Sequence, residues 1–446
     1  MLDFILIIIF CILGVIVGFI TGLLPGLHVN NVALIMLTAS SSIVAVCSPL
    51  FTYGLSEQFL LILIAGFMIS VAIAHSFVNT IPGTFIGAPD EDTALSVLPA
   101  HGMLLEGEGY KAVALSALGS YGAIFFCLLI LFPLRFIVGP PLSLYAAIQE
   151  VMVWVLIAIV ILMIATEKTR ITEVAQRGVL PAVLGMVFAT FVFFLSGIFG
   201  LIILDFPLSS PIGLPAPVLF PALAGLFGAP TLLTSLLTKP NIPAQKLEPL
   251  VLNQIEKKLS IVSVVTGSFA GVIVSIIPGV TSAIGTVLAM NLRQRSSREQ
   301  TIVTLSSVNT AAAFCVTLML FILQKTRSGV IIAVSQLIAV EPWNSFLMPV
   351  GLTYLLMFLI LGGSLSYFFT LFFGKIFAQQ FHKIPYQSLV VITMIFLCVL
   401  VVLFTGLLGL LVLFTATSIG SLPVCWGVRR SHCMGVLLVP IILYFL

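Results

Sequence analysis

The stretch DFILIIIFCILGVIVGFITGLLPGLHVNN, from Asp3 to Asn31, decides the fold of this chain. No Asp, Glu, Lys or Arg occurs between Asp3 and Glu57, and residues 4–24 alone can cross roughly 30 Å of hydrocarbon at about 1.5 Å per residue. The apolar run then meets Pro25-Gly26. Backbone that is not helical at membrane depth is tolerated only where it is buried in protein or lines a water-filled cavity. The stretch therefore predicts a broken membrane helix beside a transport pathway.

The composition of the whole chain agrees with this interpretation. Of 446 residues, 60% are hydrophobic and 7% are charged, and the mean hydropathy is +1.28. These values exclude a soluble enzyme with a single core and predict an all-α polytopic protein that crosses the cell membrane several times. The first apolar run lacks a basic leader and a cleavage site, so we expect it to be retained.

The basic residues of the chain lie between the apolar segments and form no long run. The net charge of +3 therefore indicates cytoplasmic loops, and we expect no nucleic-acid partner. Arg429, Arg430 and His432 precede the last apolar run. We expect them to contact membrane lipid headgroups or to control topology.

A second break, PGVTSAIG from Pro278 to Gly285, interrupts the later half of the chain. Its flanks, Lys257-Lys258 and Arg293–Arg295, are both basic and are therefore both assigned to the cytoplasm. The intervening 34 residues must enter the membrane and return, as a hairpin of about 17 residues per arm with its tip at Pro278-Gly279. The first break has no Lys or Arg before Lys111, so its hairpin is expected to enter from the outside.

The two breaks resemble each other. Aligning Pro25 with Pro278 gives an offset of 253, which also superposes Gly18 on Gly271. Similar units that insert in opposite directions are typical of secondary transporters with inverted-topology repeats. We therefore predict two re-entrant broken-helix hairpins, with a first repeat over 1–177, connecting spans and a cytoplasmic loop over 178–258, and a second repeat with C-terminal spans over 259–446. A second echo, 78–80 with 308–310 at an offset of 230, is short enough to arise by chance.

Polar side chains follow each break. His28, Asn30 and Asn31 stand where a new half-helix begins, and Thr281 and Ser282 hold the corresponding place in the second hairpin. Free N–H groups at a helix start carry a partial charge of about half a unit and can bind a carboxylate or phosphate. The alternative is that these side chains only cap their helices. His28 either couples proton movement to transport or is a neutral filler of a polar pocket.

The block NTIPGT, from Asn79 to Thr84, ends the third apolar run. Its amide and hydroxyl groups can line a cavity beside an unwound Pro82-Gly83, or can form hydrogen bonds between helices. Asp90, Glu91 and Asp92 then either bind or gate a coupling cation or form a solvated loop. The complete set of predicted substrate-binding residues is Pro25, Gly26, His28, Asn30, Asn31, Asn79, Thr80, Pro82, Gly83, Thr84, Pro278, Gly279, Thr281, Ser282, Asn309 and Thr310.

Together these motifs resemble the TctA family, the large membrane subunit of tripartite tricarboxylate transporters. The resemblance rests on GFITGLLPG at 18–26, the NTIPGT block, the spacing of Gly107 and Gly109, FPALAGLF at 220–227, and Pro278-Gly279, and it covers most of the chain. It implies import of a carboxylate delivered by an extracytoplasmic binding protein, together with a small membrane subunit. The chain looks most like an archaeal-type branch, with PGLHVNN where the family usually has PGLGP. Because this departure, like Thr310-Ala311, falls on the presumed ligand region, citrate-like specificity does not follow.

The preferred function is a gradient-driven or facilitative transporter that holds an anionic substrate near the membrane centre. It needs no cofactor, no bound metal and no catalytic residue, and Na⁺ or H⁺ is its expected coupling ion. A flippase for a polyprenyl-phosphate lipid is the rival within transport, since a phosphate suits a helix start equally well. A membrane-embedded metal hydrolase would use His101, Glu106, Glu108 and the acids at 90–92, but no ligand spacing supports it. A purely structural membrane subunit is the remaining alternative.

Overall fold

A computed structural model of the chain describes residues 2–24, 29–87, 97–169, 171, 179–211, 218–238, 242–278, 280–291, 297–381, 383 and 385–446. Within these residues all regular secondary structure is helical. Nine described helices are long and apolar enough to cross a membrane, or ten if the bent pair α7–α8 counts as one span. The predicted all-α polytopic membrane fold is confirmed.

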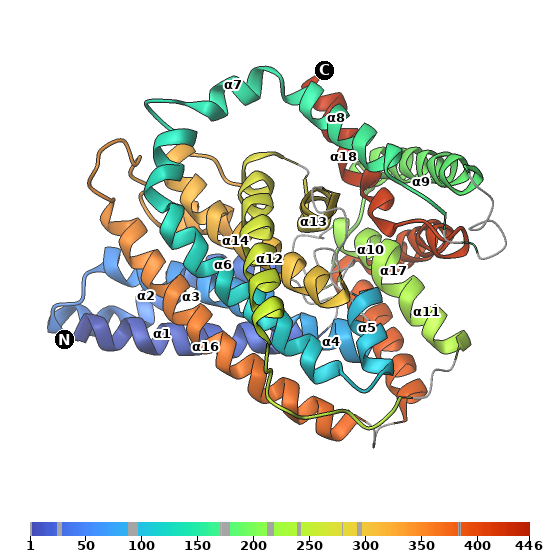
Figure 1. The fold of residues 1–446 in the computed structure, drawn as a ribbon. Coiled ribbons are helices and arrows are strands. Elements are labelled where there is room, and N and C mark those ends of the chain that lie inside the picture. The colour runs from blue at the N-terminus through green and yellow to red at the C-terminus, as the bar shows by residue number, and fades with distance from the viewer. Residues whose placement is uncertain are drawn as a thin grey trace.

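The larger of two groups of helices packs around the central helices α3 and α14 (Figure 1). Most of its buried side chains belong to one continuous hydrophobic cluster. Its helices are α1 (Leu2–Leu23), α2 (Val29–Cys47), α3 (Glu57–Val78), α4 (Thr80–Phe85), α5 (Val97–Leu105), α6 (Gly109–Val138), α12 (Gln254–Ile276), α14 (Arg298–Leu323), α15 (Gly329–Leu337) and α16 (Val350–Phe381).

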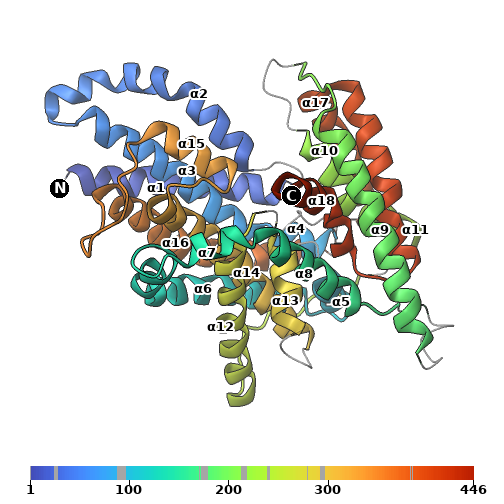
Figure 2. The same ribbon diagram turned by 90° about the horizontal axis from the view of Figure 1, so that it is seen from above.

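The smaller group has a second hydrophobic cluster of its own. Its helices are α8 (Met152–Ala165), α9 (Leu180–Leu204), α10 (Leu219–Leu223), α11 (Ala229–Thr238), α17 (Tyr386–Cys425) and α18 (Gly435–Phe445), with α7 (Leu144–Glu150) as the connection from α6 and a π-helical turn (Ala224–Gly228) between α10 and α11. Figure 2 shows α18 between the two groups. The helix α13 (Ser282–Asn291) belongs to this cluster through Ile284 and Val287. The chain therefore passes from one cluster to the other at the second break.

The helices α1 and α12 approach a central helix in the same way. A Cβ atom added to Gly18 would lie 2.4 Å from the carbonyl oxygen of Val71 in α3, and one added to Gly271 would lie 2.6 Å from that of Val308 in α14. Such close approaches require glycine. The equivalent contacts one turn earlier are Gly14 to Phe67 at 2.7 Å and Gly267 to Thr304 at 2.5 Å. The packing thus repeats at the expected offset of 253 between α1 and α12, while the inverted relation of the two units stays a prediction.

The same contacts bear on the second echo in the sequence. Val71 and Val308 occupy equivalent positions, so α3 and α14 correspond at an offset of 237. Asn309 is then equivalent to Ala72, so the packing favours the interpretation that the likeness of 78–80 to 308–310 arises by chance. The likeness in the sequence differs from the match in the packing by seven residues, about two helical turns. Residues two turns apart lie on the same face of a helix.

The first arm of the second break, 259–276, has about the predicted length of 17 residues, whereas the helical part of the second arm is shorter than predicted. The helix α12 has 23 residues and α13 has 10. An N-terminal capping box, in which Asn253 and Glu256 exchange side-chain hydrogen bonds with the backbone, starts α12 within the polar segment before the apolar run. The helix α13 folds back on α12, because a Cβ at Gly285 would lie 2.6 Å from Cγ2 of Val274. In the first unit, α2 instead packs against α3 and α15 (Figure 2).

The NTIPGT block is helical, which corrects the expectation of an unwound Pro82-Gly83. The helix α4 runs from Thr80 to Phe85 and follows α3 after a single turn residue, Asn79. Proline is compatible with this place because N–H groups in the first turn of a helix have no partner within that helix. All six residues from Thr80 to Phe85 are buried.

The basic segment before α18 points inward, so its expected position at lipid headgroups is wrong. The side chain of His432 is 1% exposed, and its Nε2 lies 2.8 Å from Oε2 of Glu167. Nε of Arg429 lies 2.9 Å from the same carboxylate oxygen, and Arg430 donates to the carbonyl oxygen of Phe227 at 3.2 Å. These contacts join the end of α8 to the start of α18, which α8 also packs against.

Candidate functional site

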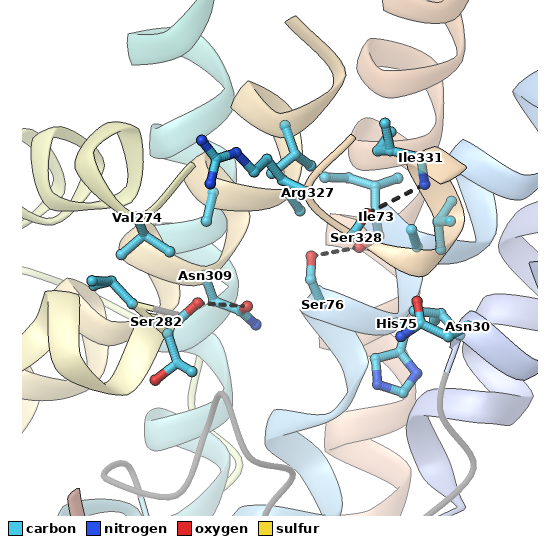
Figure 3. Close-up of a pocket in the computed structure, with 18 of the residues that line it drawn as sticks. Asn30, Ile73, His75, Ser76, Val274, Ser282, Asn309, Arg327, Ser328 and Ile331 are labelled. Atoms are coloured by element: carbon cyan, nitrogen blue, oxygen red, sulfur yellow. Dashed lines mark hydrogen bonds between the residues drawn. The ribbon is translucent and has the colours of Figure 1, made fainter. Parts of the chain in front are cut away.

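A cavity of about 410 Å³ lies where the two groups of helices meet. Its walls come from α3, α14 and α16 of the larger group, from α18 of the smaller group, and from the starts of α2, α13 and α15. Figure 3 shows polar side chains from these elements around one space. The volume falls in the lower part of the roughly 300–1,000 Å³ range typical of small-molecule sites.

Three helices begin at the cavity. The starts are marked by Val29 of α2, by Thr281, whose carbonyl oxygen accepts the first bond of α13 from Gly285 N at 2.9 Å, and by Ser328, the N-cap of α15. Each helix start carries a partial positive charge of about half a unit. The arrangement resembles transporter sites in which broken helices direct their N-termini at an anionic group.

One wall joins the second break to α14. Ser282 Oγ donates to Oδ1 of Asn309 at 3.4 Å, and both side chains are buried. The Oγ1 atom of Thr281 is buried and has no hydrogen-bond partner among the described residues. A ligand acceptor or donor at this point would satisfy it, since buried polar atoms are ordinarily paired.

The opposite wall joins α3 to the starts of α2 and α15. The Nδ1 atom of His75 is 3.1 Å from Oγ1 of Thr21 in α1, which fixes the imidazole ring at the cavity (Figure 3). Asn30 lies so close to the start of α15 that a Cβ at Gly329 would be 2.7 Å from its Oδ1 atom. The helices α2 and α15 therefore begin beside each other.

Arg327 supplies a full positive charge. It lines the cavity just before the start of α15, and one of its amino groups donates to the hydroxyl of Tyr145 at 2.9 Å. Its guanidinium carbon is 5.6 Å from the centre of the same ring, within the range of a cation–π contact. The tyrosine positions the guanidinium, and no described lining residue is an Asp or Glu that would neutralise it.

The structure brings together residues predicted at both breaks. Those that line the cavity are Asn30, Asn79, Pro278, Thr281, Ser282 and Asn309. The described candidates that are not among its lining residues are Thr80, Pro82, Gly83, Thr84 and Thr310. The candidates Pro25, Gly26, His28, Gly279, Asp90, Glu91 and Asp92, and the side chain of Asn31, lie outside the described residues. The functional roles of all these residues stay predictions.

Sequence reasoning missed part of the lining. Arg327 and Ser328 lie in QKTRSG, which has the composition of an ordinary polar loop. A cation followed by an N-cap serine and an apolar run is nevertheless a signal for a helix start that attracts anions. His75 and the α18 residues Leu437 and Ile441 were also missed. No sequence pattern indicates that α18 reaches a cavity made by the other group.

Three residues named for the alternative hydrolase are described, and each is engaged elsewhere, whereas the acids at 90–92 lie outside the described residues. Glu106 forms an ion pair with Arg298, and Glu108 lies 3.2 Å from Nζ of Lys111. The Nδ1 atom of His101 is 3.3 Å from the carbonyl oxygen of Thr84. Among the described residues no group of three or more His, Cys, Asp or Glu side chains could hold a metal ion.

Comparison with known proteins identifies the family. The profile of the tripartite tricarboxylate transporter TctA family matches residues 8–435. The chain belongs to the TctA family. A relative, the uncharacterized protein MJ1079 of Methanocaldococcus jannaschii, is 30% identical over 443 residues, which are 98% of this chain and 99% of the relative. No solved structure matches this TctA chain.

Family membership agrees with the membrane architecture. TctA proteins are the large subunits of tripartite transporters, which also contain a small membrane subunit and a binding protein. With nine described helices able to cross a membrane, this chain is a multi-pass membrane component of a secondary transporter. Within that architecture the cavity lies at the starts of α2 and α13 and at the meeting of two helix groups, where transporter sites are typically found.

Proposed function

We propose that this TctA protein transports a carboxylate and that the cavity at the two breaks is its substrate site. The observation that carries the proposal is the convergence of Arg327 with the starts of α2, α13 and α15 on one space. A carboxylate there would accept charge-assisted hydrogen bonds from the guanidinium and would lie at the positive ends of the helices.

The position of the cavity supports alternating access. The helix α13 lies between the two groups: Ile284 and Val287 join the hydrophobic cluster of the smaller group, whereas Ala289 packs with Ala270 of α12 and Val308 of α14 in the larger group. A shift of one group relative to the other would therefore move α13 and change the walls of the site. Such rocking around a fixed site is the general behaviour of transporters built from repeats.

Coupling to a proton or sodium gradient is part of the proposal. The imidazole of His75 lines the cavity, and its hydrogen bond to Thr21 links the cavity to α1, which makes this side chain our candidate for the coupling group. We also propose that substrate reaches this subunit from an extracytoplasmic binding protein and that a small membrane subunit accompanies it, as in other members of the family.

Reconstitution of the purified chain into liposomes tests the function. Labelled carboxylates would be offered with and without proton and sodium gradients, and a labelled polyprenyl phosphate would be offered to the same vesicles. Gradient-dependent uptake of a carboxylate supports the proposal. Movement of the lipid phosphate between leaflets, with no uptake of any acid, would instead establish the flippase. A shift of activity by one gradient alone identifies the coupling ion.

A further inference from the structure

The cavity carries little positive charge for a site that would hold a tricarboxylate. Among its described lining residues Arg327 is the one permanently charged side chain, and none is acidic. Helix starts add partial charges of only about half a unit each.

Arg327 is held at the edge of the cavity with hydrogen-bonding capacity to spare. One amino group donates to Tyr145, and the Nε atom is buried with no hydrogen-bond partner among the described residues. A guanidinium binds a carboxylate through two parallel N–H donors. The unsatisfied Nε–H donor can therefore bind an oxygen of one carboxylate group. If Arg327 served only to stabilise the protein, this buried donor would be expected to have a partner within it.

Most of the remaining lining is hydrocarbon. Val274 comes from α12, Ile277 from the second break and Val316 from α14, and Leu437 and Ile441 come from α18. A second or third carboxylate on the ligand would move from water to these apolar surfaces, where it would have no fully charged partner. Burial of an unpaired charge is far more costly than burial of an apolar body, which these side chains would favour.

We propose that the site selects monovalent organic acids with an apolar body over dicarboxylates and tricarboxylates. Arg327 binds the carboxylate, and the hydrocarbon walls receive the rest of the molecule. This inference rests on the proposed function of the cavity as a carboxylate site and adds the charge class of its substrate.

Three six-carbon acids of increasing charge provide the test. Binding of 4-methylpentanoate, adipate and citrate to the full chain in lipid nanodiscs would be measured by calorimetry at pH 7.5. We expect the monocarboxylate to bind at least about tenfold more tightly than the other two acids. Arg327→Gln should weaken its binding by at least about tenfold, because the charge-assisted hydrogen bonds are lost, and Arg327→Lys should retain part of the affinity.

Lys325 offers a matched control. Its Nζ atom lies 5.0 Å from the centre of the Tyr145 ring, yet it does not line the cavity. Lys325→Gln removes the same charge from the same loop and should leave binding unchanged. Equal losses in both variants would overturn the assigned role of Arg327.

The binding results distinguish failure of the inferred charge class from failure of the proposed carboxylate site. Tighter binding of adipate or citrate than of the monocarboxylate would overturn the charge class while leaving a carboxylate site intact. Failure of wild-type protein to bind any of the acids, in nanodiscs where it remains folded, would overturn both.

Discussion

Ser282, the first residue of α13, donates a hydrogen bond to the amide oxygen of Asn309 in α14 over 3.4 Å. Since the oxygen accepts this bond, the amide NH₂ group remains a donor for other partners. The pair joins the second break to a central helix at the wall of the cavity. The pair therefore connects the start of α13 to an amide group that can donate a hydrogen bond to an anion.

Replacement of this amide by a carboxylate tests the electrostatics of the site. Asn309→Asp should weaken carboxylate binding at pH 7 by about tenfold or more, because a like charge in a poorly hydrated cavity repels the ligand. Binding in nanodiscs measures the effect. Thr317→Ser is the control, since Thr317 is buried on the same helix but is neither a lining residue nor a predicted site residue, and it should bind normally. Undiminished affinity of Asn309→Asp would remove Asn309 from the site.

The glycine contacts of α1 and α12 make a prediction about stability. Gly18→Ala and Gly271→Ala should each destabilise the protein by roughly 1–3 kcal/mol, because the new Cβ would overlap a backbone carbonyl in α3 or α14. Unfolding of the purified protein in mixed micelles with increasing SDS measures the loss.

The control for this series is Gly83→Ala. Gly83 is buried within α4, but a Cβ there would meet no atom within 4 Å. Alanine should be neutral or stabilise the helix by up to about 1 kcal/mol. If all three variants lost equal stability, the two close helix contacts would not explain the effect.

The helix starts that follow the two predicted breaks were the most predictable part of the described fold. Pro25 and Pro278 each stand in an apolar run. In a membrane an interrupted helix is tolerated only where protein or water can satisfy its backbone. Asn30 and Ser282 were placed at helix starts by the same argument, and both line the cavity. Local rules were sufficient because proline and helix-capping preferences act within one turn of the chain.

Long-range packing accounts for what the sequence did not reveal. Arg327 stands between two apolar runs, and only the approach of α15 to α2 places it at the cavity. The contacts of His432 with Glu167 join residues 265 positions apart, so its sequence context indicated a lipid headgroup contact instead. Pro82 was misread as a breaker because its place in the first turn of α4, where proline is tolerated, depends on the turn at Asn79.

The amides near the first break give a third prediction. Asn79→Ala and Asn30→Ala should abolish measurable binding while the protein remains folded and inserted, since hydrogen bonds to a charged ligand contribute about 1.5–3 kcal/mol each. Ser70→Ala is the control, because Ser70 is buried in α3, the helix that ends before Asn79, but is neither a lining residue nor a predicted site residue. Ligand affinity and SDS unfolding would be measured on the same preparations. Wild-type affinity in both asparagine variants would exclude this wall from the site.

The buried carboxylate at the end of α8 gives a prediction about acid stability. Burial alone would raise the pKa of Glu167, but the hydrogen bond from His432 and the charge of Arg429 outweigh it and hold the pKa below its usual value. The resulting stabilisation is complete above the unfolded-state pKa of about 4.3 and is lost as pH falls through the lower folded-state pKa.

Glu167→Gln should therefore unfold more easily than wild type at pH 7.5, on the order of 3 kcal/mol, because Arg429 is left without its countercharge. This difference should begin to shrink as the pH falls below about 4.3, where the carboxyl group of the unfolded chain takes up a proton while the folded one is still ionised. Thermal unfolding midpoints from pH 7.5 to 3.5 would follow both proteins. Asp205→Asn, at an exposed turn after α9, should track wild type throughout. A difference that stays constant to pH 3.5 would show that the charge of Glu167 contributes nothing to holding α8 against α18.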